Sequence, residues 1–382
     1  MSGSACIGTR QVSGRTVSVR DLRPEKSHHR VLISTTSRLT GEFNSAELLI
    51  THAFPGFQSE EFQNFCRPSS TVRQSLVVVH KTSYESQDVV SFSRDQGFAE
   101  DLTAYLSVLF GKRFDNHGDL QHDGYFFMPD TNVLRIPCNQ SLPFTSNAPR
   151  RGLEIPLDLS EGWRIAPLLT PFKSKWKQKH ISTLGVACRF YAQALRSYEF
   201  YPELAYLHLI TAGEVLSSGF RFRKQSLLDD NAKHLIGQIQ ESCDQSEVIA
   251  RKVYSRLFQV KATFTRALKA QLNSFFFSHS ESNEAHFRLT NSQIERRIGA
   301  AYDLRSKYLH SGVEFGTWVK LFSAKGAEVV PGKPVTSDKE MNRILERAPT
   351  FIGLERIIRY SLLKRINDRL TPIDHRLSRR AS

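Results

Sequence analysis

Residues 292–312 read SQIERRIGAAYDLRSKYLHSG, and the spacing within this stretch decides how the C-terminal half of the chain is expected to fold. Ser292, with Glu295 three positions later, is typical of the capping box that opens a helix, and Gly312 is typical of a helix stop. The apolar residues between them recur at helical spacing: Ile294, Ile298 and Ala301. The stretch therefore predicts an amphipathic helix that packs one stripe against a core.

The next position on that stripe is occupied by Arg305. A charged side chain on a core-facing stripe is costly unless it is paired or faces a cleft, so we expect Arg305 to have a partner. His310 follows five residues later, which is about 140° around the axis of an ideal helix. The two side chains can converge on one phosphate only if the helix ends or loosens between them.

Arginine and histidine suit chemistry on a phosphodiester. The planar guanidinium donates two parallel hydrogen bonds to a phosphate, and an imidazole titrates near working pH. Arg305 would hold the phosphate while His310 activates the 2′-hydroxyl or protonates the leaving oxygen, which would cleave RNA without a metal. The competing interpretation is structural: Arg305 pairs with a carboxylate such as Glu214 or Asp303, and His310 caps carbonyls at the helix end.

Helical spacing continues through most of the chain after residue 175. Pro202 is well placed to open one of these helices, because proline is favoured in a first helical turn. The expected helices cover about residues 181–198, 202–217, 245–273, 292–309 and 351–370. Four or five amphipathic helices joined by modest loops predict an all-α bundle.

The first half of the chain has a different pattern, in which short β-branched runs alternate with turn residues. The expected strands are Val31–Thr36, Glu47–Thr51, Leu76–His80 and Val89–Phe92, with Gly124–Phe127 and Val133–Ile136 as two further candidates. Residues 98–110 have helical spacing and are closed by Gly111. This half is therefore expected to be an α+β domain.

Five prolines between residues 143 and 171 mark a connector between the two halves. We expect a basic, flexible tail over 1–30, an α+β sensor or regulatory domain over 31–165, a helical bundle over 175–370 and a basic tail over 371–382. His28 and His29 fall in the first tail and are given no role.

The net charge of +14 is unevenly distributed between these parts. Residues 31–170 carry −5, whereas residues 171–382 carry +15, of which +7 lies within 251–310. Such an asymmetry is typical of two units with different partners. The helical half is the one expected to meet a phosphate-rich partner.

Composition narrows the class of protein. With 40% hydrophobic and 24% charged residues, the chain is typical of a globular protein and unlike disordered or collagen-like chains. No apolar run approaches the ~18 residues of a membrane-spanning helix, so we expect no membrane partner. The five cysteines include no C-x-x-C pair, which argues against a disulfide framework and a thiolate zinc site. We therefore expect a cytoplasmic protein.

The run Tyr302-Asp303-Leu304-Arg305-Ser306-Lys307-Tyr308-Leu309-His310-Ser311-Gly312 closely resembles the R-x4-6-H signature of HEPN domains, in particular the Apea-like HEPN group. The segment Ala212-Gly213-Glu214-Val215-Leu216 is similar to that family's second helix, and a closing helix over 354–366 follows the motif. The resemblance covers roughly residues 175–370. It implies an all-α bundle that forms a homodimer through the helical domain, so that two copies of the motif share one site.

Many HEPN domains are metal-independent ribonucleases, often with defence or toxin roles in prokaryotes, and others only bind. The resemblance implies an endoribonuclease that acts on tRNA or another cellular RNA without a cofactor. Arg305 and His310 would be catalytic, supported by Ser306, Glu214, Tyr302 and Lys307. The residue after the arginine is usually Asn, Asp or His in active members, whereas Ser306 can hydrogen-bond but cannot hold charge. The alternative is therefore a catalytically inactive HEPN module that binds nucleic acid or a nucleotide.

A second group of polar residues lies in the first half, over residues 115–123. It contains Asp115, His117, Asp119, His122 and Asp123, whose oxygens and imidazoles could bind a divalent metal. The spacing matches no ligand motif, and the same residue types are typical of a turn after a helix. We expect a loop here, with a metal-dependent enzyme as the weaker alternative.

Overall fold

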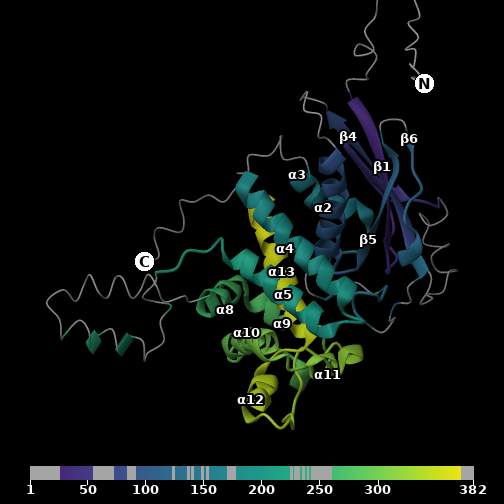
Figure 1. Cartoon of the computed structure of the whole chain (residues 1–382). Helices are drawn as coiled ribbons and strands as arrows, with labels where there is room; N and C mark the ends of the chain where they lie inside the picture. Colours follow the sequence, from purple (N-terminus) through teal and green to yellow (C-terminus); the bar gives the residue numbers. More distant parts are fainter. Residues whose placement is uncertain are drawn as a thin grey trace, which may run out of the picture.

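The computed structural model describes two connected regions of the chain (Figure 1). The described residues are 26–54, 73–83, 92–122, 125–135, 142–147, 155–169, 178–223 and 260–370, with short pieces at 138, 150–151, 227, 233–234, 237–238 and 241. The basic C-terminal tail expected over 371–382, and residues 1–25 of the N-terminal one, lie outside these ranges. Residues 170–177 do too, whereas most of the connector expected between 143 and 171 is described.

The first region is a six-stranded antiparallel sheet with the strand order β2-β3-β4-β1-β5-β6. Its strands are β1 (Lys26–Thr35), β2 (Phe43–Asn44), β3 (Leu48–His52), β4 (Gln74–Ser83), β5 (Phe114–His122) and β6 (Tyr125–Phe126). Along β4 the buried residues Leu76, Val78 and His80 alternate with half-buried ones. This period of two buries one face of the sheet, as in antiparallel sheets packed on one side.

Four expected strands are confirmed with shifted ends, as β1, β3, β4 and the two-residue β6 within the expected 124–127. The others differ. Strand β1 begins at Lys26 rather than Val31, so the segment assigned to a tail contains His29, which is completely buried. The strand expected at Val133–Ile136 is wrong, because Asn132–Arg135 form a 3-10 turn. Residues 84–91 lie outside the described part of the chain, and Phe92 begins a helix.

The second region is helical. Its helices are α4 (Gln178–Ser197), α5 (Pro202–Ser217), α8 (Val260–Gln271), α9 (Ser274–Ser278), α10 (Ile294–Ser311), α11 (Gly316–Lys320), α12 (Lys339–Arg347) and α13 (Phe351–Leu370). Helix α2 (Phe92–Phe110) and the short α3 (Ala166–Leu169) precede them. Among the described residues, none of these helices combines the length and apolar character needed to cross a membrane.

The expected helices are found where sequence signals were strong. Helix α5 has the expected bounds, with Pro202 in its first turn. Of the helix expected over 245–273, the structure describes α8, and 245–259 lie outside the described residues. The expected capping box does not form, because α10 is preceded by Gln293, whose side chain makes no capping hydrogen bond.

Helix α2 lies between the sheet and the helices α4 and α13, so the two regions share one buried core (Figure 1). Arg359 of α13 donates hydrogen bonds to the carbonyls of Val108 and Leu109 in the last turn of α2. A cation at the C-terminal end of a helix also favours the helix dipole. Gly111 follows, with a φ of +62°, the left-handed conformation that ends a helix.

A buried ion cluster reinforces this junction. Arg150 donates two hydrogen bonds to Glu355, at 2.9 and 2.6 Å, and one to Glu281 at 3.0 Å. Tyr191 of α4 also donates to Glu355. Burial opposes the charge of Arg150, but Glu281 and Glu355 outweigh it and raise the pKa of the guanidinium. Residues from the connector, α4 and α13 are thereby held together in the interior.

Candidate functional site

Helix α10 carries most of the residues singled out in the sequence. Its buried stripe contains Ile294, Ile298 and Ala301, as expected, and the next position is the half-buried Arg305. The helix packs against α5, α8 and α12. Each flank of α10 therefore presents its polar residues to a different neighbour.

Arg305 faces α5. Its Nη2 lies 3.5 Å from Oε2 of Glu214, and its guanidinium lies 5.5 Å from the centre of the Tyr302 ring. Burial, the charge of Glu214 and a hydrogen bond to it raise the pKa of the Tyr302 hydroxyl. Gly213 precedes Glu214, and a Cβ there would come within 2.6 Å of Phe264. The missing side chain lets α5 approach α8 closely and brings Glu214 beside the motif. Arg305 thus has the acidic partner that its position on the stripe requires.

His310 faces elsewhere. It is exposed, and it lines an open groove of about 1390 Å³ between α8, α10 and α12, together with Ser306 and Lys307. Neither Arg305 nor Tyr302 is among the residues that line this groove. Helix α10 continues through Ser311 and ends at Gly312, whose φ is +63°. Because the helix is regular between the two motif residues, one chain alone does not bring Arg305 and His310 together at the groove.

The acidic residues of the groove are neutralised by lysines. Lys261 lies 2.6 Å from Asp303, Lys269 lies 2.5 Å from Glu295, and Lys307 lies 2.5 Å from Glu340. The hydrogen bond to Glu340 is the main cause that raises the pKa of Lys307. Lys307 therefore joins α10 to α12, rather than standing as a free cation beside His310.

Four arginines that the sequence analysis did not single out line the same groove: Arg266 on α8, Arg296 on α10, and Arg343 and Arg347 on α12. Within the described part of the chain, their side chains have no hydrogen bond and no ion pair. Two sequence signals pointed toward them. The segment 251–310 carries a charge of +7, and Arg343 and Arg347 are four positions apart, which places them on one face of a helix.

The polar group at 115–123 is not a loop. Residues 114–122 form strand β5, and Asp123 lies outside the described residues. Asp115 accepts hydrogen bonds from Arg73 and Arg113, and His117 bonds to Ser34 and to the carbonyl of Asp130. Among the described residues, no three His, Cys, Asp or Glu side chains are grouped so as to hold a metal ion. These polar residues stabilise the sheet region.

The groove and the motif thus combine a solvent-accessible imidazole, a paired arginine on the neighbouring flank and four arginines that have no acidic partner among the described residues. Such a surface can bind a polyanion and offers a general acid or base beside it. Comparison with known proteins returned no protein-family model, no curated protein and no solved structure that matches this chain.

Proposed function

We propose that the protein is a metal-independent endoribonuclease of the HEPN type, with His310 as general acid or base and Arg305 as the phosphate-binding group. The observation that supports this proposal most is the position of His310 in a groove whose acids are neutralised and whose arginines are in excess. An RNA backbone attracted to those arginines would pass the imidazole.

The proposed cleavage is an intramolecular transesterification that needs no metal ion. The 2′-oxygen attacks the adjacent phosphorus, a 2′,3′-cyclic phosphate forms, and the bond from phosphorus to the 5′-oxygen breaks. His310 accepts the 2′-hydroxyl proton or gives a proton to the leaving oxygen, depending on its protonation state. Arg305 stabilises the negative charge that develops on the phosphoryl oxygens.

A homodimer is part of the proposal, because Arg305 and His310 face different neighbours within one chain. Leu309, between them on the helix, is 56% exposed. A second copy packed on this flank of α10 would cover the Leu309 side chain. Two α10 helices packed against each other would place the Arg305 of one copy near the His310 of the other. We place the enzyme in the cytoplasm, acting on tRNA or other cellular RNA in a defence or toxin role, with the sheet region as its sensor.

The second candidate function is a module of the same family that binds nucleic acid or a nucleotide without cleaving it. The pairing of Arg305 with Glu214 favours this alternative, because a guanidinium engaged by a carboxylate is less available to a phosphate. Ser306 after the arginine favours it too, since a hydroxyl cannot carry charge.

Product chemistry distinguishes the two functions. Purified protein is incubated in EDTA with end-labelled tRNA and total RNA, beside the Arg305→Ala variant, and the product ends are analysed. Cleavage that leaves 2′,3′-cyclic phosphate and 5′-hydroxyl ends, absent with Arg305→Ala and with 2′-O-methyl RNA, supports the ribonuclease. Intact RNA recovered from a saturated complex supports the binding module, and cleavage unchanged by Arg305→Ala contradicts the assigned site.

A further inference from the structure

The groove between α8, α10 and α12 has two ends of different character. Ion pairs and hydrogen bonds along α10 show in which direction α8 and α12 run relative to it. Lys269 of α8 meets Glu295 near the start of α10, and Arg297 of α10 donates to the carbonyl of Arg347 at the end of α12. Lys307, near the end of α10, meets Glu340 at the start of α12. Helices α8 and α12 therefore both run antiparallel to α10.

The four arginines gather toward the start of α10. Arg296 lies in its first turn, Arg347 in the last turn of α12, and Arg266 in the second half of α8. His310 lies in the last turn of α10, fourteen residues after Arg296, which is about 21 Å along a helix that rises 1.5 Å per residue. Arg296 and Arg347 thus lie at the end of the groove opposite His310, and Arg343 lies one turn of α12 closer to it.

The arginines are not needed to stabilise the surrounding helices. The last turn of α12 has carbonyls that a basic residue could satisfy, but Arg297 already donates to those of Glu346 and Arg347. The acid nearest to Arg296 along the chain, Glu295, is engaged by Lys269. Among the described residues, the groove therefore has more guanidinium donors than free acids to accept from them, which indicates an anionic ligand.

We propose that Arg266, Arg296, Arg343 and Arg347 form a binding site for the backbone of single-stranded RNA, which extends to about 20 Å along the groove from His310 at Arg296. The choice of RNA rests on the proposed function. Guanidinium groups favour phosphate oxygens because their planar fork donates two hydrogen bonds to one anion. Several phosphates are required to satisfy arginines that come from three helices, which favours a chain over a single nucleotide.

A single strand fits this site better than a duplex. Arg266 is half-buried and Ala300 on the groove floor is 4% exposed, so a backbone that contacts them must enter the groove. A duplex presents two backbones on a wide cylinder and would touch the exposed Arg296, Arg343 and Arg347 but would not reach the half-buried Arg266. The site therefore sets a minimum substrate length, because an RNA must reach from the arginines to His310 to be held and cleaved.

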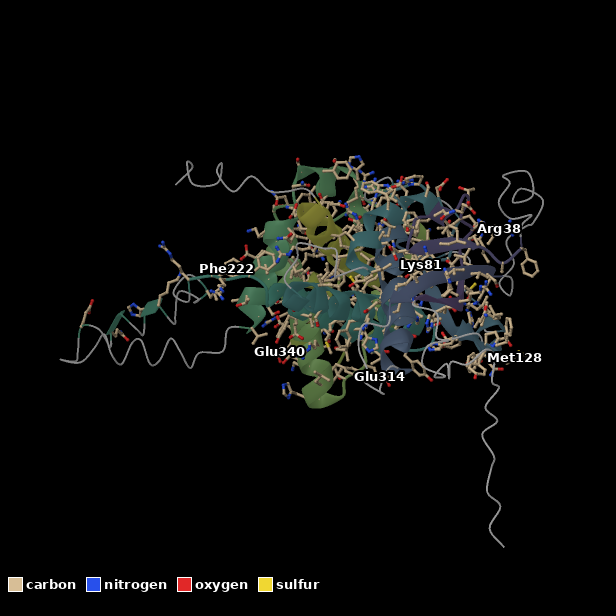
Figure 2. The ribbon with its side chains drawn as sticks, turned by 90° about the horizontal axis from the view of Figure 1, so that it is seen from above. Arg38, Lys81, Met128, Phe222, Glu314 and Glu340 are labelled. Carbon is tan, nitrogen blue, oxygen red and sulfur yellow. The ribbon has the colours of Figure 1, made fainter. Side chains whose placement is uncertain are left out.

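Binding is tested on a protein that cannot cleave, so that affinity and catalysis are separated. In the His310→Ala background, fluorescence anisotropy measures the affinity for a labelled 12-nucleotide single-stranded RNA at several salt concentrations. Arg343→Ala/Arg347→Ala is compared with Lys81→Ala/Arg164→Ala, which removes the same charge from positions outside the groove. Figure 2 shows Lys81 on the sheet half and Glu340, which lines the groove, on the helical half. Circular dichroism confirms that each variant is folded.

The expected result is an affinity at least about 10-fold weaker for the groove variant, with a salt dependence reduced by about 1.4 in log–log slope for two lost phosphate contacts. The control pair binds within 2-fold of the parent, and Arg343→Lys/Arg347→Lys falls between them, because lysine keeps the charge but loses the fork. Equal losses in both double variants, unchanged binding by the groove variant, or tighter binding of duplex RNA or polyglutamate overturns the inference.

The same set of measurements separates this inference from the proposed function. If single-stranded RNA binds through the arginines but the wild-type protein never cleaves it, the proposed ribonuclease activity is contradicted and the proposed binding site is supported. Suppose instead that the wild-type protein cleaves RNA in EDTA and that Arg343→Ala/Arg347→Ala cleaves short and long RNA at the wild-type rates. The proposed ribonuclease activity is then supported and the proposed arginine binding site is contradicted.

Discussion

The guanidinium of Arg305 lies 3.5 Å from the carboxylate of Glu214, across the contact between α10 and α5, while His310 on the same helix lines a groove on another flank. The two residues of the motif are thus divided between two surfaces of one regular helix. Glu214 fixes the direction of Arg305, and the guanidinium of Arg305 lies over the face of the Tyr302 ring. A shared site for Arg305 and His310 requires a second copy of the chain.

Glu214→Gln tests whether that pair positions Arg305 for the reaction. The amide keeps the size of the side chain but removes the charge that holds the guanidinium. We expect kcat to fall about 10-fold, which corresponds to about 1.4 kcal/mol of lost transition-state stabilisation, with KM unchanged and partial rescue by Glu214→Asp. The free energy of unfolding should change by less than about 1 kcal/mol, because the pair is partly exposed. An unchanged or increased kcat would show that Glu214 does not position Arg305 for catalysis.

The helical half of the fold is largely predictable from the sequence, because local signals decide it. Helix α5 starts where Pro202 fixes the backbone, and the stripe of α10 is read directly from its spacing. The partner of Arg305 is also predictable, since a charge on a buried stripe needs an acid and Glu214 is one of two candidates. The division of Arg305 and His310 between two surfaces depends on how far α10 remains regular, which spacing alone does not decide.

Strand β5 shows why other parts are not predictable. Residues 115–119 contain Asp, Asn, His and Gly, which are typical of turns, yet they pair with β1 in the centre of the sheet. Their polar groups are satisfied by residues far away in the sequence, such as Arg73 for Asp115 and Ser34 for His117. The groove arginines are equally unpredictable from the sequence, because they come together only through the packing of three helices.

Glu355→Ala is expected to be strongly destabilising. Glu355 is completely buried and accepts hydrogen bonds from Arg150 and Tyr191, so its removal leaves a buried guanidinium with Glu281 alone. Breaking a buried pair in this way costs about 3–5 kcal/mol. Urea unfolding measures the loss, and Glu340→Ala, which breaks an exposed pair with Lys307, serves as the control with a loss below about 1 kcal/mol. Similar losses for both variants would mean that the buried cluster does not hold the two regions together.

Gly111→Ala is expected to destabilise the junction between α2 and α13. The residue has a φ of +62°, and a Cβ would come within 2.7 Å of Nε of Arg359. The left-handed conformation alone costs an L-residue about 1–2 kcal/mol. Within α2, nothing lies within 4 Å of a Cβ built on Gly97, so Gly97→Ala should raise stability by up to about 1 kcal/mol. Thermal unfolding of both variants checks this, and a Gly111→Ala protein as stable as wild type would contradict the packing described.

Stability is expected to fall in mild acid because of His80. This histidine is buried between His29 and Phe98, and burial, with smaller contributions from the charges of His29 and His122, lowers its pKa to about 3. The unfolded chain takes up a proton near pH 6.5 and the folded chain does not, so stability is lost as the pH falls below 6.5. From pH 7 to 5 the loss from this group is about 2 kcal/mol.

His80→Gln removes the titrating group. The fall in the free energy of unfolding between pH 7 and pH 5, measured by urea unfolding, should therefore be about 2 kcal/mol smaller than in the wild-type protein. His52, whose pKa is lowered mainly by its burial, accounts for part of the loss that remains. Parallel pH profiles for the variant and the wild-type protein would show that His80 is protonated, or accessible, in the folded state.

The role of His310 in metal-independent RNA cleavage is tested most directly by single-turnover cleavage of one labelled single-stranded RNA in EDTA, by wild type, His310→Ala and the control His286→Ala, an exposed histidine outside the groove. We predict equal rates for wild type and His286→Ala and a rate at least about 100-fold lower for His310→Ala, with RNA affinity unchanged. Cleavage by His310→Ala at the wild-type rate, or RNA that binds wild type and is never cut, would contradict it.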